Sequence, residues 1–217
     1  MDRDTFLTRV GQASLTSVLP SSPPVAAELS EYQADDLVAL FRARAQAVNA
    51  VVHGPISRHG APRVVVGIVT GHNATKFMAW DDLPAPGVAS AIISEGMERV
   101  DHQIPREGHG RHTLGYLDLD VGITGADAGL AESGSVVLAH GPGRPRMASL
   151  IPEVHVVLIE VSSITTTLAH WAAKHPHTAA ETTNLVVITG PSRTGDIEQQ
   201  LNLGVHGPRH VHIVMIR

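Results

Sequence analysis

Apolar residues recur at helical spacing in an early part of the chain, between Asp35 and Val52. The apolar positions are Leu37, Val38, Phe41, Ala45, Val48 and Val52, with Arg42, Arg44 and Gln46 between them. This spacing is typical of an amphipathic helix that buries one face. The pattern therefore predicts a helix over residues 35–52. Before it we expect a short helix over Arg3–Gln12, followed by a Pro/Ser-rich segment, Ser17–Pro24.

Short apolar runs, many of them rich in β-branched residues, predict the strands. They are Val64–Val69, Lys76–Trp80, Val121–Ala131, Ser135–Ala139, Val154–Val161, Leu185–Ile188 and His210–Ile216. Continuous apolar runs of this length are typical of strands that are buried on both faces. The turn Glu132–Gly134 lets its two flanking runs pair, although a short helix over Ala126–Ala131 is the alternative.

The C-terminal half alternates between strand and helix patterns. Ser163 is expected to cap a helix that runs to about Lys174, and a last helix is expected over Ile197–Leu203. Alternation of this kind predicts an α/β fold with a mostly parallel central sheet flanked by helices. Ligands of open α/β sheets bind outside the carboxyl ends of the strands, so the loops after Ile123 and Ile188 are expected to share one cleft.

Composition limits the classes of protein and function. A chain of 217 residues with 43% hydrophobic content can bury the core of one domain, so we expect a helix and flexible arm over residues 1–30 and a single domain over 31–217. A net charge of −5 and 3% aromatic residues argue against nucleic-acid binding. No apolar run approaches the length of a membrane span, and the N-terminus lacks an apolar signal segment, so a cytoplasmic protein is expected.

The segment Ile188–Pro208, ITGPSRTGDIEQQLNLGVHGP, joins a strand to a polar loop and a helix start. Side-chain oxygens are offered there by Ser192, Thr194 and Asp196. Unpaired backbone N–H groups at a helix start, next to the guanidinium of Arg193, could hold a phosphate or carboxylate. The alternative is that these side chains merely cap the helix.

Three long segments resemble the lactate-utilisation (LUD) domain family, in particular its LutC-like branch. They are Ile188–Pro208, Val121–Leu138 (VGITGADAGLAESGSVVL) and Arg146–Ile159 (RMASLIPEVHVVLI). Ser133 and Ser135 depart from the family pattern, in which threonine is more typical, but both keep a hydroxyl. The resemblance implies a fold similar to that of ribose-5-phosphate isomerase, glucosamine-6-phosphate deaminase and the CoA transferases.

The resemblance also singles out Glu132 and His206. A glutamate can act as nucleophile or base in that group of folds, which would need Glu132 close to the substrate. The alternative is that Glu132 accepts hydrogen bonds from turn amides. His206 could carry a proton or contact a partner, or it could be an ordinary hydrogen-bonded loop histidine.

Thr124 and Arg146 are two further candidates, of which Thr124 belongs to the same expected cleft. Thr124 follows the strand end at Ile123 and is expected to face the Ser192–Asp196 loop. Arg144 and Arg146 lie in a Gly/Pro-rich loop, where a guanidinium could clamp a carboxylate or phosphate. Arg146 fits the family pattern better and is the predicted ligand-binding residue; an ordinary solvent-facing arginine is the alternative.

Histidine is unusually frequent, at 14 residues. Three pairs have spacings that could place two rings on one face: His109 with His112 on a helix, and His175 with His177 and His210 with His212 on extended segments. Each pair supplies two ligands, whereas zinc needs three or four and the chain has no cysteine. We therefore predict scattered neutral histidines and no metal site.

The LutC-like resemblance implies a component of a bacterial system that oxidises L-lactate to pyruvate. Such a component works with separate cysteine-rich iron–sulfur proteins, and the absence of cysteine here means that thiolate-bound clusters are expected only in those partners. Whether this chain is itself an enzyme stays open. One alternative is a stand-alone isomerase or CoA-transferase type of enzyme on a phosphosugar or acyl-CoA; another is a non-catalytic scaffold.

Overall fold

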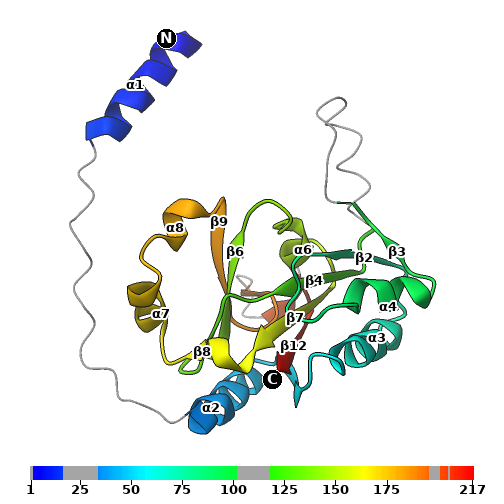
Figure 1. Ribbon diagram of the computed structural model, residues 1–217. Helices are drawn as coiled ribbons and strands as arrows, with labels where there is room; N and C mark the ends of the chain where they lie inside the picture. Colours follow the sequence, from blue (N-terminus) through cyan, green and yellow to red (C-terminus); the bar gives the residue numbers. More distant parts are fainter. Residues whose placement is uncertain (1, 17–33, 102–117, 196–200, 205) are drawn as a thin grey trace.

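The computed structural model describes residues 2–16, 34–101, 118–195, 201–204 and 206–217. Its centre is a sheet of six strands, all parallel to their neighbours (Figure 1). In spatial order these strands are β1 (Val51–Ile56), β12 (His210–Ile216), β7 (Val154–Glu160), β4 (Val121–Gly125), β2 (Lys76–Ala79) and β3 (Glu98–Arg99). The α/β class with a mostly parallel sheet, expected from the sequence, is confirmed.

Each face of the central sheet is covered by a different kind of layer. Helices α3 (Ala61–Gly71) and α4 (Val88–Ser94) pack on one face and bury an aliphatic core there (Figure 1). The other face packs against α2 (Ala34–Ala47), α6 (Met147–Leu150) and a second, smaller sheet. A Cβ on Gly122 of β4 would lie 1.6 Å from the carbonyl oxygen of Ala148, so glycine is what lets α6 lie this close.

The second sheet has four strands. In spatial order they are β8 (Ile164–Thr165), β5 (Ala128–Leu130), β6 (Ser135–His140) and β9 (Asn184–Ile188). Strands β5 and β6 form the antiparallel pair predicted around the Glu132–Gly134 turn. Strand β9 pairs antiparallel with β6 and not with the central sheet, so the expectation that strand–helix alternation in the C-terminal half builds one parallel sheet is wrong at Leu185–Ile188.

The apolar run Val64–Val69, predicted as a strand, belongs to helix α3. The buried residues of α3 are Ala61, Val65, Ile68 and Val69, which is helical spacing. Pro62 stands in the first turn, where the missing N–H costs nothing. Tertiary burial of one helix face overrides the β-propensity of the valines.

The other predicted helices also need correction. The helix expected over residues 35–52 ends at Ala47, because Asn49 adopts a left-handed φ of 68° and turns the chain into β1. Helix α7 (Leu168–Lys174) is capped by Thr167, whose side chain accepts a hydrogen bond from the backbone N–H of His170, and not by the expected Ser163.

The last expected helix is wrong where the structure describes it. Strands β10 (Arg193–Gly195) and β11 (Leu201–Leu203) pair antiparallel as a short two-stranded ladder. Leu201–Leu203 is therefore extended, and residues 196–200 lie outside the described part of the chain. The remaining elements are α1 (Arg3–Thr16), the 3₁₀ turn η2 (Val161–Ser163) and α8 (Thr178–Glu181).

Two loops of the smaller sheet pack on the end of α2. Gly134 and Gly190 both adopt left-handed φ values, of 69°. A Cβ on Gly134 would lie 2.2 Å from the backbone nitrogen of Ala45, and one on Gly190 would lie 2.2 Å from the carbonyl oxygen of Val48. The C-terminal end of α2 is thus in direct backbone contact with both loops.

Candidate ligand site at the carboxyl edge of the central sheet

A cleft of about 260 Å³ lies at the carboxyl ends of β2, β4 and β7. Trp80 follows β2, Gly125 ends β4 and Glu160 ends β7. The full lining is Trp80, Asp82, Pro84, Gly125, Ala126, Asp127, Arg144, Glu160 and Ser163. This is the edge where the parallel sheet was expected to bind a ligand, and the loop after Ile123 contributes to it as predicted.

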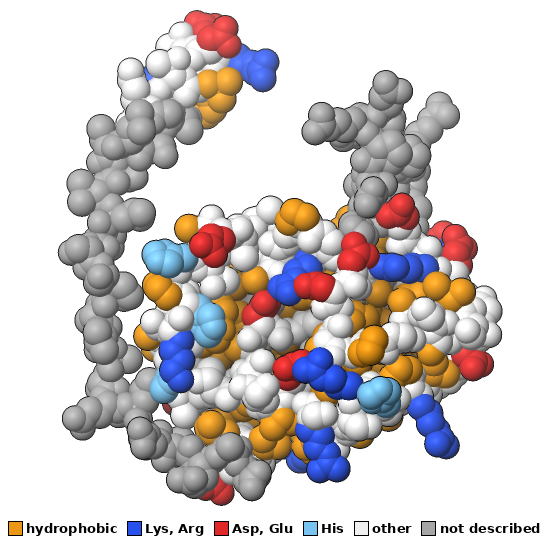
Figure 2. All heavy atoms as spheres, in the orientation of Figure 1, with side chains coloured by type: hydrophobic (Ala, Val, Ile, Leu, Met, Phe, Trp, Pro, Cys, Tyr) orange, Lys and Arg blue, Asp and Glu red, His pale blue; other side chains and the backbone are white. Residues whose placement is uncertain are grey.

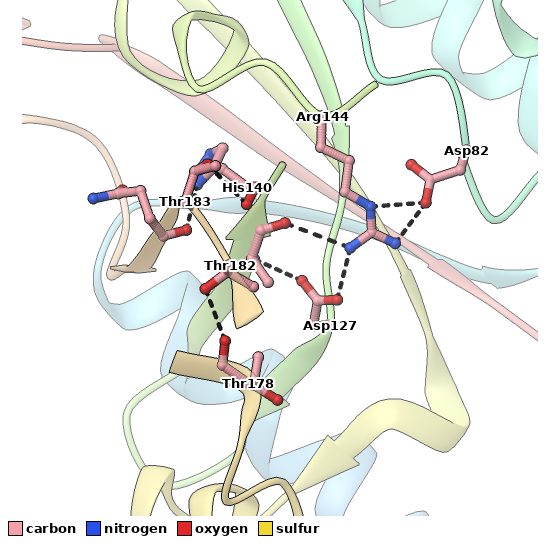
Figure 3. Close-up of polar contacts among 9 residues, drawn as sticks. Asp82, Asp127, His140, Arg144, Thr178, Thr182 and Thr183 are labelled. Atoms are coloured by element: carbon pink, nitrogen blue, oxygen red, sulfur yellow. Dashed lines mark hydrogen bonds and ion pairs between the residues drawn. The ribbon is translucent and has the colours of Figure 1, made fainter. Parts of the chain in front are cut away.

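Arg144 is held in the wall of this cleft by two aspartates (Figure 3). Its Nε donates to Asp82 Oδ2 at 2.7 Å, and its Nη1 donates to Asp127 Oδ1 at 2.9 Å. Its Cζ lies 5.0 Å from the ring centroid of Trp80, a cation–π distance. Hydrogen bonding to Asp82 and then to Asp127 raises the pKa of Arg144, although partial burial opposes the shift. The guanidinium is therefore a fixed positive charge.

The two aspartates are bound to different extents. Asp127 uses its second oxygen, Oδ2, to accept the backbone N–H of Ala139 at 2.7 Å, and its side chain is 25% exposed. Asp82 lies in the loop after β2, and its side chain is 52% exposed. Asp127 is thus part of the β6 framework, whereas Asp82 is a surface carboxylate resting on Arg144.

The loops that carry these side chains are joined by backbone contacts. Asp81 donates its N–H to the carbonyl of Gly143 at 2.9 Å. The indole N–H of Trp80 donates to the carbonyl of Pro145 at 3.3 Å. Gly143 has a φ of 72°, so a residue without a side chain suits this close approach. The position of Arg144 is therefore set by the fold as well as by its ion pairs.

Two buried histidines lie behind the cleft. The ring of His140 meets that of Trp80 edge-on at 5.6 Å, and burial followed by the nearby charge of Arg146 lowers the pKa of His140. His155 is fully buried, with its Nε2 3.0 Å from the hydroxyl of Thr124, and burial lowers its pKa to about 3. Both rings are neutral at pH 7. Thr124 is fully buried, so it supports His155 and does not line the cleft.

The Ile188 loop lies away from this cleft, because β9 belongs to the other sheet. None of its described residues lines the cleft. The backbone N–H of Ser192 donates to the carbonyl of Pro208 at 2.9 Å, and the guanidinium of Arg193 donates to the carbonyl of Val48, also at 2.9 Å. Those groups are used within the fold, which corrects the expectation of one cleft shared by both loops.

The other predicted site residues are dispersed. Thr194 is in β10, where it pairs with Asn202, and Asp196 lies outside the described residues. Glu132 is exposed in the β5–β6 turn, and its backbone N–H donates to the carbonyl of Thr166 at 3.1 Å. Arg146 is exposed at the start of α6.

His206 is exposed and lines a separate hollow of about 550 Å³. The charged residues of that hollow are Asp118, Asp120, Glu153 and Arg209. Asp120 is committed to the backbone N–H groups of Thr75 and Lys76, at 2.7 and 2.9 Å. His206 therefore does not meet Glu132 or the Arg144 cleft, and the proposed roles of His206 and Glu132 stay predictions.

Three histidines, in β1, in β12 and at the end of α3, form a hydrogen-bonded row. His53 Nε2 is 3.1 Å from His212 Nδ1, and His212 Nε2 is 3.0 Å from His72 Nε2. His212 thus offers opposite nitrogens to its neighbours, so the three do not converge on one point. Within the described residues, no group of three metal-ligating side chains is found. Burial, with three neighbouring histidines, lowers the pKa of His212 to about 4.

The three predicted histidine pairs have different outcomes. His210 and His212 lie two positions apart in β12, on one face, and both rings contact His72, as the spacing predicted. His175 and His177 lie at the end of α7 and just before α8, so the extended segment expected for them is wrong. His109 and His112 fall outside the described residues.

Charge on the surface is mixed. Acidic and basic side chains alternate across the face shown in Figure 2, with apolar groups scattered between them. This agrees with the low total of basic residues, 16 Lys and Arg against 21 Asp and Glu. Among the described helices, none is long and apolar enough to cross a membrane. The cytoplasmic location stays a prediction.

The parallel sheet, its covering layers and the cleft at its carboxyl edge define an α/β protein of the open-sheet type. The chain belongs to the LUD domain family, whose model matches residues 38–216. This family membership was the one expected from the sequence segments.

Similar proteins of other organisms support this family assignment. Lactate utilization protein C of Geobacillus sp. is 34% identical over 158 residues, which cover 69% of this chain and 65% of that protein. Lactate utilization protein C of Halalkalibacterium halodurans is 30% identical over 197 residues, covering 86% and 82%. A crystal structure of a DUF162 family protein from Deinococcus radiodurans matches with a TM-score of 0.65 at 19% identity, covering 86% of this chain and 100% of that one. That last likeness supports the fold alone.

Sequence reasoning missed Asp82 and Trp80 and preferred Arg146 to Arg144. The signal for Asp82 was weak, since Asp81-Asp82 after an apolar run reads as an ordinary polar turn. Arg144 was recognisable only as one of two loop arginines. What distinguishes Arg144 from Arg146 is its ion pair with Asp127, which precedes β5 and which the sequence alone does not show.

Proposed function

We propose that this chain is the LutC-like component of a system that oxidises L-lactate to pyruvate, acting with separate iron–sulfur subunits. The observation that carries the proposal is the match to two proteins named Lactate utilization protein C, one of them over 86% of this chain. Oxidation of lactate to pyruvate releases two electrons and two protons. A chain with no cysteine cannot itself hold a thiolate-bound cluster, so electrons that pass through such clusters must go to another protein.

The cleft around Arg144 is the part of the molecule that we assign to this role. It lies at the edge where parallel sheets bind ligands, and it contains a fixed guanidinium, carboxylates and an aromatic ring. The stand-alone alternative needs Glu132 as base or nucleophile. Because Glu132 is exposed and is not among the residues that line this cleft, the geometry gives that alternative no support.

Growth on a single carbon source tests the proposal. A strain that lacks this chain is expected to lose growth on L-lactate and to keep growth on pyruvate, and a plasmid copy of the chain restores it. Unchanged growth on lactate would defeat the proposal.

Purification of the untagged chain from its own source tests the partners. Iron is expected to co-purify with partner proteins and to be lost when they are removed. Turnover of a phosphosugar or acyl-CoA by the purified chain alone would instead establish the stand-alone enzyme.

A further inference from the structure

Arg144 carries the charge that a small organic acid would need, but this charge is already paired. Three hydrogen bonds use its Nε and Nη1: one to Asp82, one to Asp127 and a longer one, 3.4 Å, to the carbonyl of Ala139. Its Nη2 makes an ion pair with Asp82. One N–H of Nη2 is left over, which offers a single hydrogen bond. An incoming carboxylate can therefore bind two N–H groups of the guanidinium at once only if one of the two aspartates leaves.

The two aspartates are unequal in this respect. Removal of Asp127 would break its bond to the backbone N–H of Ala139 and leave a partly buried donor without its acceptor, which is costly. Asp82 is 52% exposed, and within the described part of the chain its side chain pairs with Arg144. An ion pair this exposed contributes little net stability, because water solvates the freed carboxylate. Asp82 is therefore the aspartate that can be displaced.

We propose that Asp82 is a built-in competitor for Arg144, and that a small 2-hydroxy- or 2-oxocarboxylate binds in this cleft by taking its place on the guanidinium. The ligand class rests on the proposed function; displacement of Asp82 rests on the geometry alone. Asp82 occupies both Nε and Nη2, the forked pair of donors that suits a bidentate carboxylate.

The remainder of the cleft suits a ligand of this size. A volume of about 260 Å³ is below the range of sites for drug-sized ligands, and it fits a three-carbon acid with some water. Trp80 supplies an apolar surface beside the guanidinium, and Ser163 and Glu160 supply groups that can hydrogen-bond a hydroxyl. Glu160 forms an ion pair with Arg58, which offsets its negative charge. Arg144 supplies the positive charge for the acid group.

Asp82→Asn is the decisive variant, because it keeps the shape of the side chain and removes its charge. Isothermal titration of the purified full chain with L-lactate and with pyruvate should show affinity roughly fivefold tighter than in the unchanged protein, since an exposed ion pair no longer competes. Arg144→Gln should lose binding. Propane-1,2-diol, which lacks the carboxylate, should not bind either protein.

Asp81→Asn is the matched control. It removes the same charge from the same loop, and the Oδ1 of Asp81 accepts a hydrogen bond from Arg99. If Asp81→Asn tightened binding as much as Asp82→Asn, the effect would be net charge and the proposal would fail. It would also fail if Asp82→Asn left affinity unchanged or weaker. Should Arg144→Gln unfold, Arg144→Lys replaces it, and carboxylate affinity equal to that of the unchanged chain would count against the site.

This test and the growth test can fail separately. If the Asp82 and Arg144 variants change carboxylate affinity as proposed, but the chain is dispensable for growth on lactate, displacement of Asp82 stands and the lactate role is rejected. If the chain is needed for growth on lactate, but its Asp82 and Arg144 variants bind carboxylates as the unchanged chain does, the lactate role stands and this site is rejected.

Discussion

The fully buried His155 predicts a specific loss of stability in mild acid. Burial lowers its pKa from the ordinary 6.5 to about 3, so the folded protein keeps the ring neutral between pH 7 and pH 5 while the unfolded chain takes up a proton. The stabilising difference is therefore fully present above pH 6.5 and is lost progressively as the pH falls toward 3. With 1.36 kcal/mol for each pKa unit, the loss between pH 7 and pH 5 is about 2 kcal/mol from this one side chain.

Urea unfolding at pH 7 and pH 5 measures this loss. Other histidines also titrate, so the comparison is with His155→Gln, whose amide stays neutral at both pH values and can still hydrogen-bond Thr124. The unchanged protein should lose about 2 kcal/mol more than His155→Gln does between the two pH values. His59→Gln, at an exposed histidine, is the control and should lose as much as the unchanged protein. Equal losses in the unchanged protein and His155→Gln would refute the reasoning.

Two further predictions concern packing and capping. Gly122→Ala should lower the free energy of unfolding by about 1–3 kcal/mol or more, because its Cβ would collide with the carbonyl of Ala148. Gly67→Ala is the control: its Cβ would point into open space within α3, so this change should be neutral or stabilise by up to about 1 kcal/mol. Urea titrations would settle this, and equal effects at the two glycines would contradict the close packing of α6. Thr167→Ala should cost about 1 kcal/mol through loss of the α7 cap, whereas Ser163→Ala should cost much less. Thermal unfolding ranks the two, and the reverse order would restore Ser163 as the cap.

The sequence predicted the sheet better than its covering layers. Val154–Val161 and His210–Ile216 became central strands because continuous apolar runs of this length must be buried on both faces. Val64–Val69 is also apolar and rich in β-branched residues but packs as a helix, since a short apolar run fits either period and its packing partners decide between them. Strand β9 was found correctly but assigned to the wrong sheet, because pairing with β6 depends on contacts far apart in the sequence.

The candidate site was predicted only as a location. A cleft does lie at the carboxyl edge, beside the loop after Ile123, as the general geometry of parallel sheets predicts. The Ile188 loop does not line that cleft, because it lies next to α2, where Arg193 reaches the carbonyl of Val48. The pairing of Arg144 with Asp82 joins residues 62 positions apart, which local spacing does not show.

The position of β1 has a consequence for how the protein is made. Val51 pairs with His212, and the end of α2, just before β1, is covered by the loops at Gly134 and Gly190. On the ribosome, the two loops that cover the end of α2 are made about 90 and about 140 residues after it, and the strand that pairs with β1 is made about 160 residues after it. Delayed closure of this kind slows folding and leaves an unpaired strand edge on the nascent chain, so cells should need chaperones to protect this early segment.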